Sequence, residues 1–288
     1  MNFLKENTSQ LITPFLILML FGLFLEIPLK DLKNSFSNFK FTKISILINF
    51  IWTPLFGYFL GLLFLNNYLD VQIGFFMLIL TPCTDWYLLF TKIAKGDVPL
   101  SLSILPINLI LQIILLPIYL TIFFSASNAL NLIDLGFSLI TITIIPFILA
   151  QILKYLFKDN KSLIISSFSK LQVVFLALAI FAIFNSEGRA LFDNLNQIFL
   201  IFIPLIIYFI INFIIAFITS KKVKFTYEEY VSLTLTTLAR NSPLALAIAI
   251  SSFPHRELIA IALVIGPLIE LPVLYIVSKV LLIIKKYY

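Results

Sequence analysis

The chain has 288 residues, of which 61% are hydrophobic and 12% are charged, whereas a typical soluble domain carries about 25% charge. This composition predicts an integral membrane protein with no soluble domain, and nothing in it indicates an enzyme. The single cysteine and single histidine exclude an intrachain disulfide framework, a catalytic triad and a zinc cluster, so neither a cofactor nor a metal is expected. The net charge of +6 does not indicate a nucleic-acid partner, because the basic residues lie in short loops between apolar segments.

Nine apolar segments follow one another, each roughly 17 to 27 residues long, which is enough to cross a hydrocarbon core of about 30 Å. We expect them to span the lipid bilayer as α-helices and to form a single polytopic domain over residues 1–288. No small-residue cleavage site follows the first segment, so we expect it to be retained rather than removed as a signal peptide. The segments cover approximately residues 11–27, 44–65, 71–93, 99–124, 131–153, 162–184, 195–219, 229–253 and 257–283.

The basic residues alternate between the two sides of the predicted membrane. Of the 20 lysine and arginine residues, three lie in one set of loops, one lies inside an apolar segment, and the rest lie in the alternate loops. The positive-inside rule therefore predicts a multi-pass protein of the cell membrane with an extracellular N-terminus and a cytoplasmic C-terminus. The cytoplasmic set is Lys30, Lys33, Lys40, Lys43, Lys92, Lys95, Lys154, Lys158, Lys161, Lys170, Lys221, Lys222, Lys224, Lys279, Lys285 and Lys286.

In this topology the third and eighth segments enter the membrane from opposite sides, as an inverted repeat requires. We expect a first repeat at about residues 11–124 and a second at about residues 131–283. If each repeat has five helices, the first one lacks its opening helix.

Two apolar segments are interrupted at matching places in these repeats. Residues 81–85 (TPCTD) interrupt the third segment, and residues 239–243 (ARNSP) interrupt the eighth. Pro82 and Pro243 predict helix breaks, because proline lacks a backbone donor and strains the preceding turn. Two interrupted segments at corresponding positions are the best sequence indication of a transporter's binding site.

Arg240 is the basic residue that lies inside an apolar segment. A charge at the centre of a bilayer costs about 2.5–3.5 kcal/mol on insertion scales, so it should face the protein interior and have a partner. With Asn241, Ser242 and the carbonyls freed by the break, it could bind a polar substrate or an ion. The alternative is a structural anchor between two helices. Asp85 is the expected partner, as a gate charge or proton carrier, and its alternative role is a helix cap.

Three further residues are candidates for the binding site. Cys83 could supply a thiol to a soft metal or metalloid, although a lone buried cysteine more often fills apolar space. Glu270 lies between Pro267 and Pro272 inside the last segment, where a buried carboxyl can carry a proton. Asn108 could line a cavity or hydrogen-bond to a neighbouring helix.

The pattern resembles the bile acid:sodium symporter superfamily over nearly the whole chain. Residues 81–84 (TPCT), followed by residues 94–97 (AKGD), resemble the fourth helix of that family, and residues 266–274 (GPLIELPVL) resemble the last helix of its arsenical-resistance permeases. The resemblance implies a panel domain and a core domain in which two broken helices cross. It also implies a functional pair made of Cys83 and Glu270, which match the cysteine and glutamate of the arsenite exporters.

The sequence departs from that branch in both interrupted segments. Arsenite exporters typically have an arginine where this chain has Pro82, and an Asn-Asn-Phe-Glu-like run where it has residues 240–243 (RNSP). The second stretch is more similar to the bile-acid branch, whose members bind sodium there. A fixed guanidinium at Arg240 would repel sodium, so we expect a proton to couple transport through Asp85 or Glu270.

Two transport functions follow from these observations. The first is proton-coupled efflux of arsenite or a related metalloid or oxyanion by a secondary active transporter. The second is transport of an organic anion, bile-acid-like or carboxylate, sodium-coupled or not, with Arg240 clamping a carboxylate. A sensor that binds a ligand without transporting it is a third possibility, and no signalling domain supports it.

Overall fold

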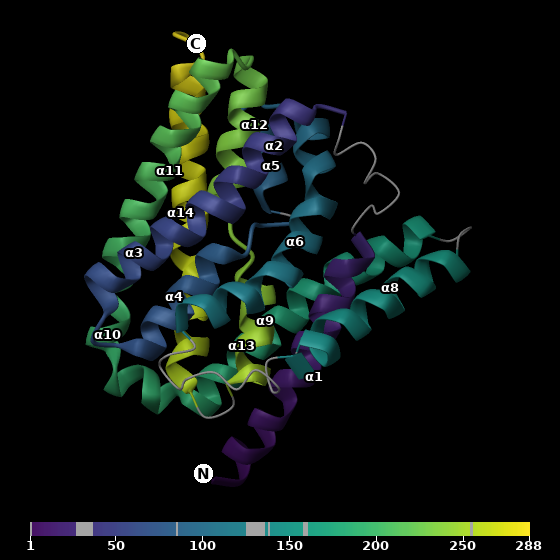
Figure 1. Ribbon diagram of the computed structural model, residues 1–288. Helices are drawn as coiled ribbons and strands as arrows, with labels where there is room; N and C mark the ends of the chain where they lie inside the picture. The colour runs from purple at the N-terminus through teal and green to yellow at the C-terminus, as the bar shows by residue number, and fades with distance from the viewer. Residues whose placement is uncertain are drawn as a thin grey trace.

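The computed structural model describes residues 2–26, 37–84, 86–124, 136–137, 139–157, 161–253 and 256–288. Within these ranges the protein is helical apart from turns and one isolated β-bridge, which confirms the predicted all-α class (Figure 1). Four helical stretches in the described part are long and apolar enough to cross a membrane: Phe39–Leu65, Val98–Phe124, Leu195–Val223 and Glu257–Ile284.

The helices follow the apolar segments of the sequence, and two of those segments are divided into half-helices. The bounds in chain order are α1 (Asn2–Glu26), α2 (Phe39–Leu47), the π-helical η2 (Ile48–Trp52), α3 (Thr53–Leu65), α4 (Leu69–Leu80), α5 (Trp86–Ile93), α6 (Val98–Phe124), the π-helical η4 (Leu139–Ile144), α8 (Ile145–Leu156), α9 (Lys161–Asp193), α10 (Leu195–Phe199), α11 (Phe202–Val223), α12 (Tyr227–Leu238), α13 (Ser242–Ser252) and α14 (Glu257–Ile284).

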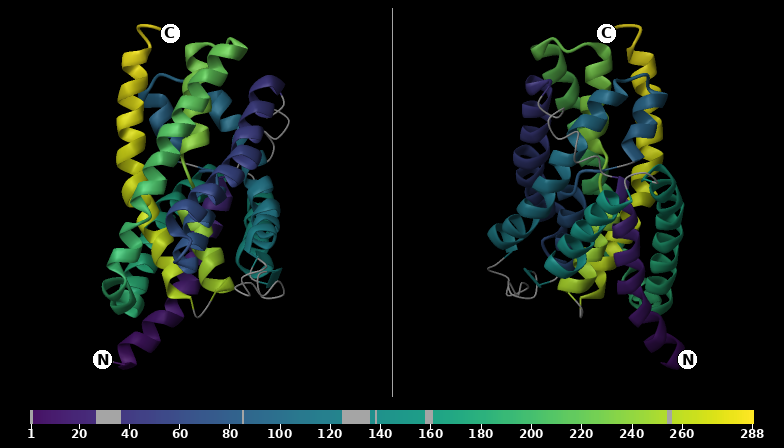
Figure 2. Two further views of the ribbon diagram at one scale, coloured as in Figure 1. Left: turned by 60° about the vertical axis from the view of Figure 1, so that its left-hand side comes forward. Right: turned by 90° about the vertical axis from the view of Figure 1, so that its right-hand side faces the viewer.

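Helices α1, α8 and α9 form a sub-bundle of their own, in which α1 packs along both partners (Figures 1 and 2). Aromatic pairs join the three helices: the ring of Phe24 meets Phe147 of α8 edge-on at 5.5 Å, and Phe21 meets Phe168 of α9 at 5.4 Å. A Cβ at Gly22 would lie 3.2 Å from the carbonyl oxygen of Phe168, so the absence of a side chain there allows the close approach of α9.

The remaining helices form the rest of the bundle, in which α14 packs mainly against α4 and α13. The half-helices beside it run in opposite directions. Asp70 in the first turn of α4 pairs with Arg256 at the start of α14, with 2.5 Å between Oδ1 and Nη2. The hydroxyl of Tyr227, at the start of α12, instead donates to the carbonyl of Leu281 near the end of α14. The two half-helix pairs α4–α5 and α12–α13 therefore approach their interruptions from opposite ends of the molecule (Figure 1).

Candidate functional site

Each interruption begins where the backbone leaves the helical conformation. Helix α4 ends at Leu80, and Thr81 is extended (φ −104°, ψ 96°), because the residue before a proline is disfavoured in the helical region. Helix α12 ends at Leu238, where Ala239 is also extended (φ −71°, ψ 140°).

The backbone groups released by one interruption bind those released by the other. The amide of Cys83 donates to the carbonyl of Ala239 at 3.0 Å, and the amide of Asn241 donates to the carbonyl of Thr81 at 2.6 Å. This pairing produces the isolated antiparallel bridge between Pro82 and Arg240. Because hydrocarbon offers no hydrogen bonds, irregular backbone at membrane depth persists only where protein satisfies it. Each interruption supplies hydrogen-bond partners for the backbone groups of the other.

Asn241 joins the interruptions through its side chain as well. Its Oδ1 accepts from the amide of Leu244 at 3.2 Å and so caps the start of α13, while its Nδ2 donates to the Thr84 hydroxyl at 3.2 Å. The asparagine predicted as a binding residue is thus also a cap and a link between the two crossing segments.

The Arg240 side chain is buried, with 2% of its surface exposed, and its donors are directed at carbonyl oxygens. Nη1 donates to Ile79 at 2.9 Å, Nε donates to Leu238 at 3.3 Å, and Nη2 donates to the carbonyl of Thr237. Nη2 also donates to Oδ1 of Asn49 at 3.3 Å. The guanidinium is therefore held mainly by backbone groups.

These carbonyls belong to the last turns of α4 and α12, whose C-terminal ends carry partial negative charge. Helix ends leave their last carbonyls without intrahelical partners, and Arg240 supplies donors to both ends at once. The guanidinium carbon also lies 5.2 Å from the ring centroid of Tyr208, at cation–π distance. A single side chain thus neutralises two converging half-helices.

Glu270 lies on α14 beside the crossing and is 4% exposed. Its Oε1 accepts the backbone amide of Arg240 at 2.8 Å. Gly266, one turn earlier, brings α14 close to the other helices: a Cβ there would lie 2.5 Å from Leu78 and 2.8 Å from the Ser242 hydroxyl oxygen. The carboxylate is therefore fixed against the start of α13.

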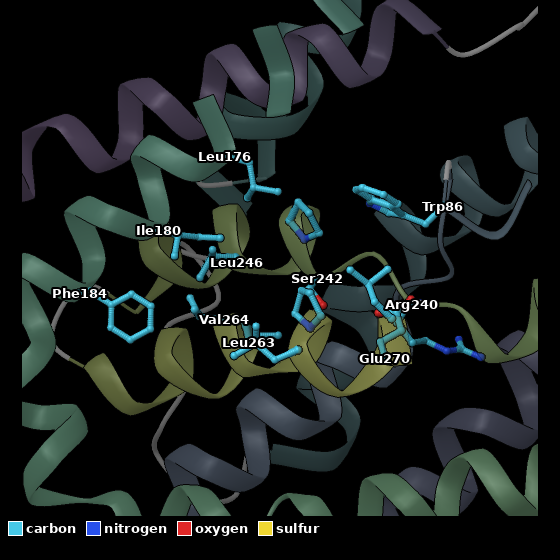
Figure 3. Close-up of a pocket in the computed structure, with 14 residues that line it drawn as sticks. Trp86, Leu176, Ile180, Phe184, Arg240, Ser242, Leu246, Leu263, Val264 and Glu270 are labelled. Atoms are coloured by element: carbon cyan, nitrogen blue, oxygen red, sulfur yellow. Dashed lines mark hydrogen bonds between the residues drawn. The ribbon is translucent and has the colours of Figure 1, made fainter. Parts of the chain in front are cut away.

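A cavity of about 180 Å³ opens beside this carboxylate, between α9, α13, α14 and the first residue of α5 (Figure 3). Most of its wall is apolar, and its polar side-chain groups come from Ser242, Glu270, Arg240 and the indole of Trp86. Figure 3 shows the guanidinium turned away from the other lining side chains, toward the carbonyls that it binds. The lining residues are Trp86, Leu176, Ile180, Phe184, Arg240, Ser242, Pro243, Leu246, Leu263, Val264, Pro267, Leu268, Glu270 and Leu271.

The structure does not bring all the predicted residues to this cavity. Cys83 is buried in its interruption and does not line the cavity. Asn108 is buried in α6, also away from the cavity, and its amide forms no hydrogen bond with any described residue; the same holds for Gln112 one turn later. Asp85 lies outside the described residues, so its predicted pairing with Arg240 remains a prediction.

Sequence reasoning assigned no role to two residues that surround the guanidinium, Asn49 and Tyr208. Each is a buried polar residue inside a long apolar segment, and that is the signal that could have indicated them. The α9 side chains in the cavity wall carry no comparable signal.

Comparison with known proteins identifies the family. The family model described as "Sodium Bile acid symporter family" matches residues 13–194, more than half of the chain. Among curated proteins, the chain is 26% identical over 250 residues to "Arsenical-resistance protein Acr3" of Corynebacterium glutamicum, a match that covers 80% of this chain and 67% of that protein. It is 24% identical over 222 residues to the Acr3 of Alkaliphilus metalliredigens, covering 75% and 61% of the two chains.

A third relative carries a different description. "Uncharacterized sodium-dependent transporter YocS" of Bacillus subtilis is 22% identical over 246 residues, covering 85% of this chain and 75% of that protein. The matched region spans about two thirds of the Acr3 proteins. Together with its membrane-length helices, the match over residues 13–194 shows that this chain is a multi-pass membrane protein that belongs to the sodium bile acid symporter family of transporters.

Proposed function

We propose that the protein is a secondary active transporter that exports arsenite or a related metalloid or oxyanion in exchange for protons. The observation that carries this proposal is the crossing of two interrupted helices beside a buried carboxylate, Glu270, in the wall of a cavity. In this proposal nine segments span the plasma membrane as two inverted repeats, with the N-terminus outside and the C-terminus in the cytoplasm.

Arg240 serves as a built-in cation in the proposed mechanism. Its guanidinium already occupies the place where the negative ends of α4 and α12 converge, and carbonyl oxygens of both helices accept its donors. A second cation at the same place would meet repulsion and fewer available oxygens. Sodium is therefore not required to hold the crossing together.

Glu270 is the proposed proton-exchanging group. Burial makes the charged form of a carboxyl group less favourable, so a buried carboxyl is suited to bind and release a proton. The group faces the cavity and contacts the backbone of Arg240, so its protonation state would act on both the substrate space and the crossing. Because Glu270 contacts both, its protonation could couple substrate binding in the cavity to the conformation of the crossing.

Cys83 is the proposed ligand for a thiol-binding substrate. It lies in the crossing itself, where its amide donates to Ala239, and thiol sulfur suits soft metalloids. The two Acr3 relatives are described as arsenical-resistance proteins, which supports the same substrate class. Because Cys83 does not line the cavity, the substrate would reach it only after the crossing rearranges.

The apolar cavity wall favours a second candidate, the transport of an organic anion. Side chains such as Leu176, Ile180 and Phe184 offer nothing to a small oxyanion but would contact a hydrocarbon skeleton. The orientation of Arg240 disfavours the carboxylate clamp expected for this function, because its guanidinium points away from the cavity. The carboxylate of such a substrate would instead lie near Ser242.

Arsenite accumulation in arsenite-sensitive cells distinguishes the two candidates. We expect lower accumulation in cells that make the protein, and loss of that effect in Cys83→Ser and Glu270→Gln. Glu257→Gln, a change of an exposed carboxylate on the same helix, is the matched control and should leave export intact. Unchanged accumulation, with the wild-type protein shown to be in the membrane, would exclude arsenite and favour the organic anion. Transport that requires sodium would contradict the role given to Arg240.

A further inference from the structure

Tyr208 of α11 lies against the guanidinium of Arg240, and the proposed transport mechanism gives it no role. None of its side chain is exposed. Its ring centroid is 5.2 Å from the guanidinium carbon, and its hydroxyl donates to the carbonyl of Thr237 at 3.2 Å. Nη2 of Arg240 donates to that same carbonyl. Tyr208 therefore contacts both the arginine and one of the groups that bind it.

Arg240 stands between two sets of acceptors. On the cavity side, Oε1 of Glu270 accepts the backbone amide of Arg240 at 2.8 Å, which places the carboxylate within reach of the arginine side chain. On the other side, the carbonyls at the ends of α4 and α12 and Oδ1 of Asn49 accept the guanidinium donors (Figure 3). Pairs of arginine and carboxylate are among the strongest hydrogen-bonded pairs in proteins. A further contact that favours the carbonyl side is therefore to be expected.

The ring of Tyr208 supplies such a contact. The face of an aromatic ring carries partial negative charge and attracts a guanidinium within about 6 Å, most strongly where water is excluded. The ring comes from α11 and the amide of Asn49 comes from η2, and neither element contributes to the described wall of the cavity. Both side chains therefore hold the guanidinium away from the space beside Glu270.

The position of the guanidinium decides which charge lies next to Glu270. Among the described residues, the titratable side chains close enough to Arg240 to interact with it electrostatically are Tyr208, Cys83 and Glu270 itself. The side chains that α9 and α13 present to the cavity are not titratable. The carboxylates and lysines of α4, α5 and α12, and the first carboxylate of α14, lie at helix ends away from the crossing: Asp70, Lys92, Glu228, Glu229 and Glu257. A guanidinium turned toward Glu270 would favour the ionised carboxylate, which would then bind a proton only at lower pH.

We propose that Tyr208 is a positioning residue whose ring holds the guanidinium of Arg240 at the two helix ends and keeps it off Glu270. The carboxyl group thereby stays able to take up and release a proton. The effect on transport rests on the proposed function, whereas the position of the guanidinium can be measured without any transport.

Changes at position 208 that alter the charge of the ring face but hardly its shape test the position of the guanidinium. The variants are Tyr208→Phe, the same position carrying trifluorophenylalanine, whose fluorines withdraw negative charge from the ring face, and Tyr208→Leu. The measurement is the reaction of Arg240 with phenylglyoxal, an apolar arginine reagent that suits the cavity wall, followed by peptide mass spectrometry of the purified full-length protein. Arg256, whose side chain is 25% exposed, is the internal reference.

We expect Arg240 to react slowly in the wild type and in Tyr208→Phe. It should react about tenfold faster in the trifluorophenylalanine and Tyr208→Leu proteins, because the loss of a desolvated cation–π contact corresponds to roughly that factor or more. Phe209→Leu removes a buried ring from the next position of α11 and is the matched control, with slow reaction expected. Trifluorophenylalanine nearly keeps the size of the ring, so it tests the contact even if Tyr208→Leu does not fold.

The second readout is the pH dependence of arsenite transport in proteoliposomes. In the proteins with a weakened or missing ring, the pH at which the rate is half-maximal should fall by about one unit, since a nearby positive charge favours the ionised carboxylate by at least that much. Tyr208→Phe should keep the wild-type profile. A merely structural role of the ring would lower the rate without moving the profile.

Equal labelling of Arg240 in all these proteins would overturn the proposal, as would equally fast labelling in the Phe209→Leu control. A pH profile that stays in place although Arg240 has become reactive would also overturn it. A wild-type protein that transports no arsenite would contradict the proposed function alone, because the labelling reports the position of the guanidinium independently.

Discussion

Replacing Arg240 by methionine tests whether the guanidinium holds the crossing together. Methionine retains an apolar stem but removes every donor. The carbonyls of Ile79, Thr237 and Leu238 then lose the guanidinium as a partner, and so does Oδ1 of Asn49. The three carbonyls lie at the buried ends of two half-helices and Asn49 is buried as well, so these groups have little access to water as a replacement.

The expected loss follows from these contacts. A buried acceptor left without a donor costs about 1–3 kcal/mol, and partial relaxation places each of the three carbonyls near the lower limit. We therefore expect Arg240→Met to lower the free energy of unfolding by about 3–5 kcal/mol, which corresponds to a fall of about 10 °C in Tm. Arg240→Lys keeps the charge but carries its donors on one nitrogen, so it cannot reach both helix ends and should lose part of this stability.

The assay is thermal unfolding of the purified protein in detergent, followed by size-exclusion chromatography of the soluble fraction. The expected order of Tm is wild type, then Arg240→Lys, then Arg240→Met. A Tm for Arg240→Met within about 2 °C of the wild type would refute the reasoning, because the carbonyls would then not depend on the guanidinium. Transport lost without a change in Tm would point instead to direct contact between Arg240 and the substrate.

Three other substitutions have expected outcomes. Glu270→Gln keeps an oxygen that can accept the Arg240 amide, so Tm should change little, while the proposed proton-driven transport, measured in proteoliposomes, should be lost. Gly74→Ala should lower the free energy of unfolding by about 1–3 kcal/mol, because its Cβ would lie 2.9 Å from a backbone oxygen of α14. Gly136→Ala, where a Cβ would meet nothing within 4 Å, is the matched control, and thermal unfolding measures both. Asn241→Ala removes the cap of α13 and should cost about 1 kcal/mol by the same assay.

Each of these expectations has a result that would contradict it. Proton-driven transport that survives Glu270→Gln would remove the carboxyl from the coupling step. Equal Tm values for the two glycine variants would mean that α4 does not approach α14 as closely as described. An Asn241→Ala protein as stable as the wild type would show that the cap contributes nothing.

The sequence by itself determined that this is a helical membrane protein, and it located both interruptions. These properties depend on local chemistry. Long apolar runs predict spanning helices, and Pro82 ends α4 at Leu80 because proline disfavours the helical conformation in the residue before it. The resemblance in residues 81–84 and 266–274 predicted the family, which the match over residues 13–194 confirmed.

Only the tertiary structure decided what Arg240 binds. The sequence singled out its charge and suggested a carboxylate partner, whereas the described partners include the carbonyl of Ile79, 161 positions away, and the side chain of Asn49, 191 positions away. Every residue has a backbone carbonyl, so no sequence pattern marks the ones that a guanidinium will meet. The same holds for the cavity wall: Ile180 and Phe184 of α9 cannot be distinguished by type from side chains that face lipid, and only helix packing brings them to the crossing.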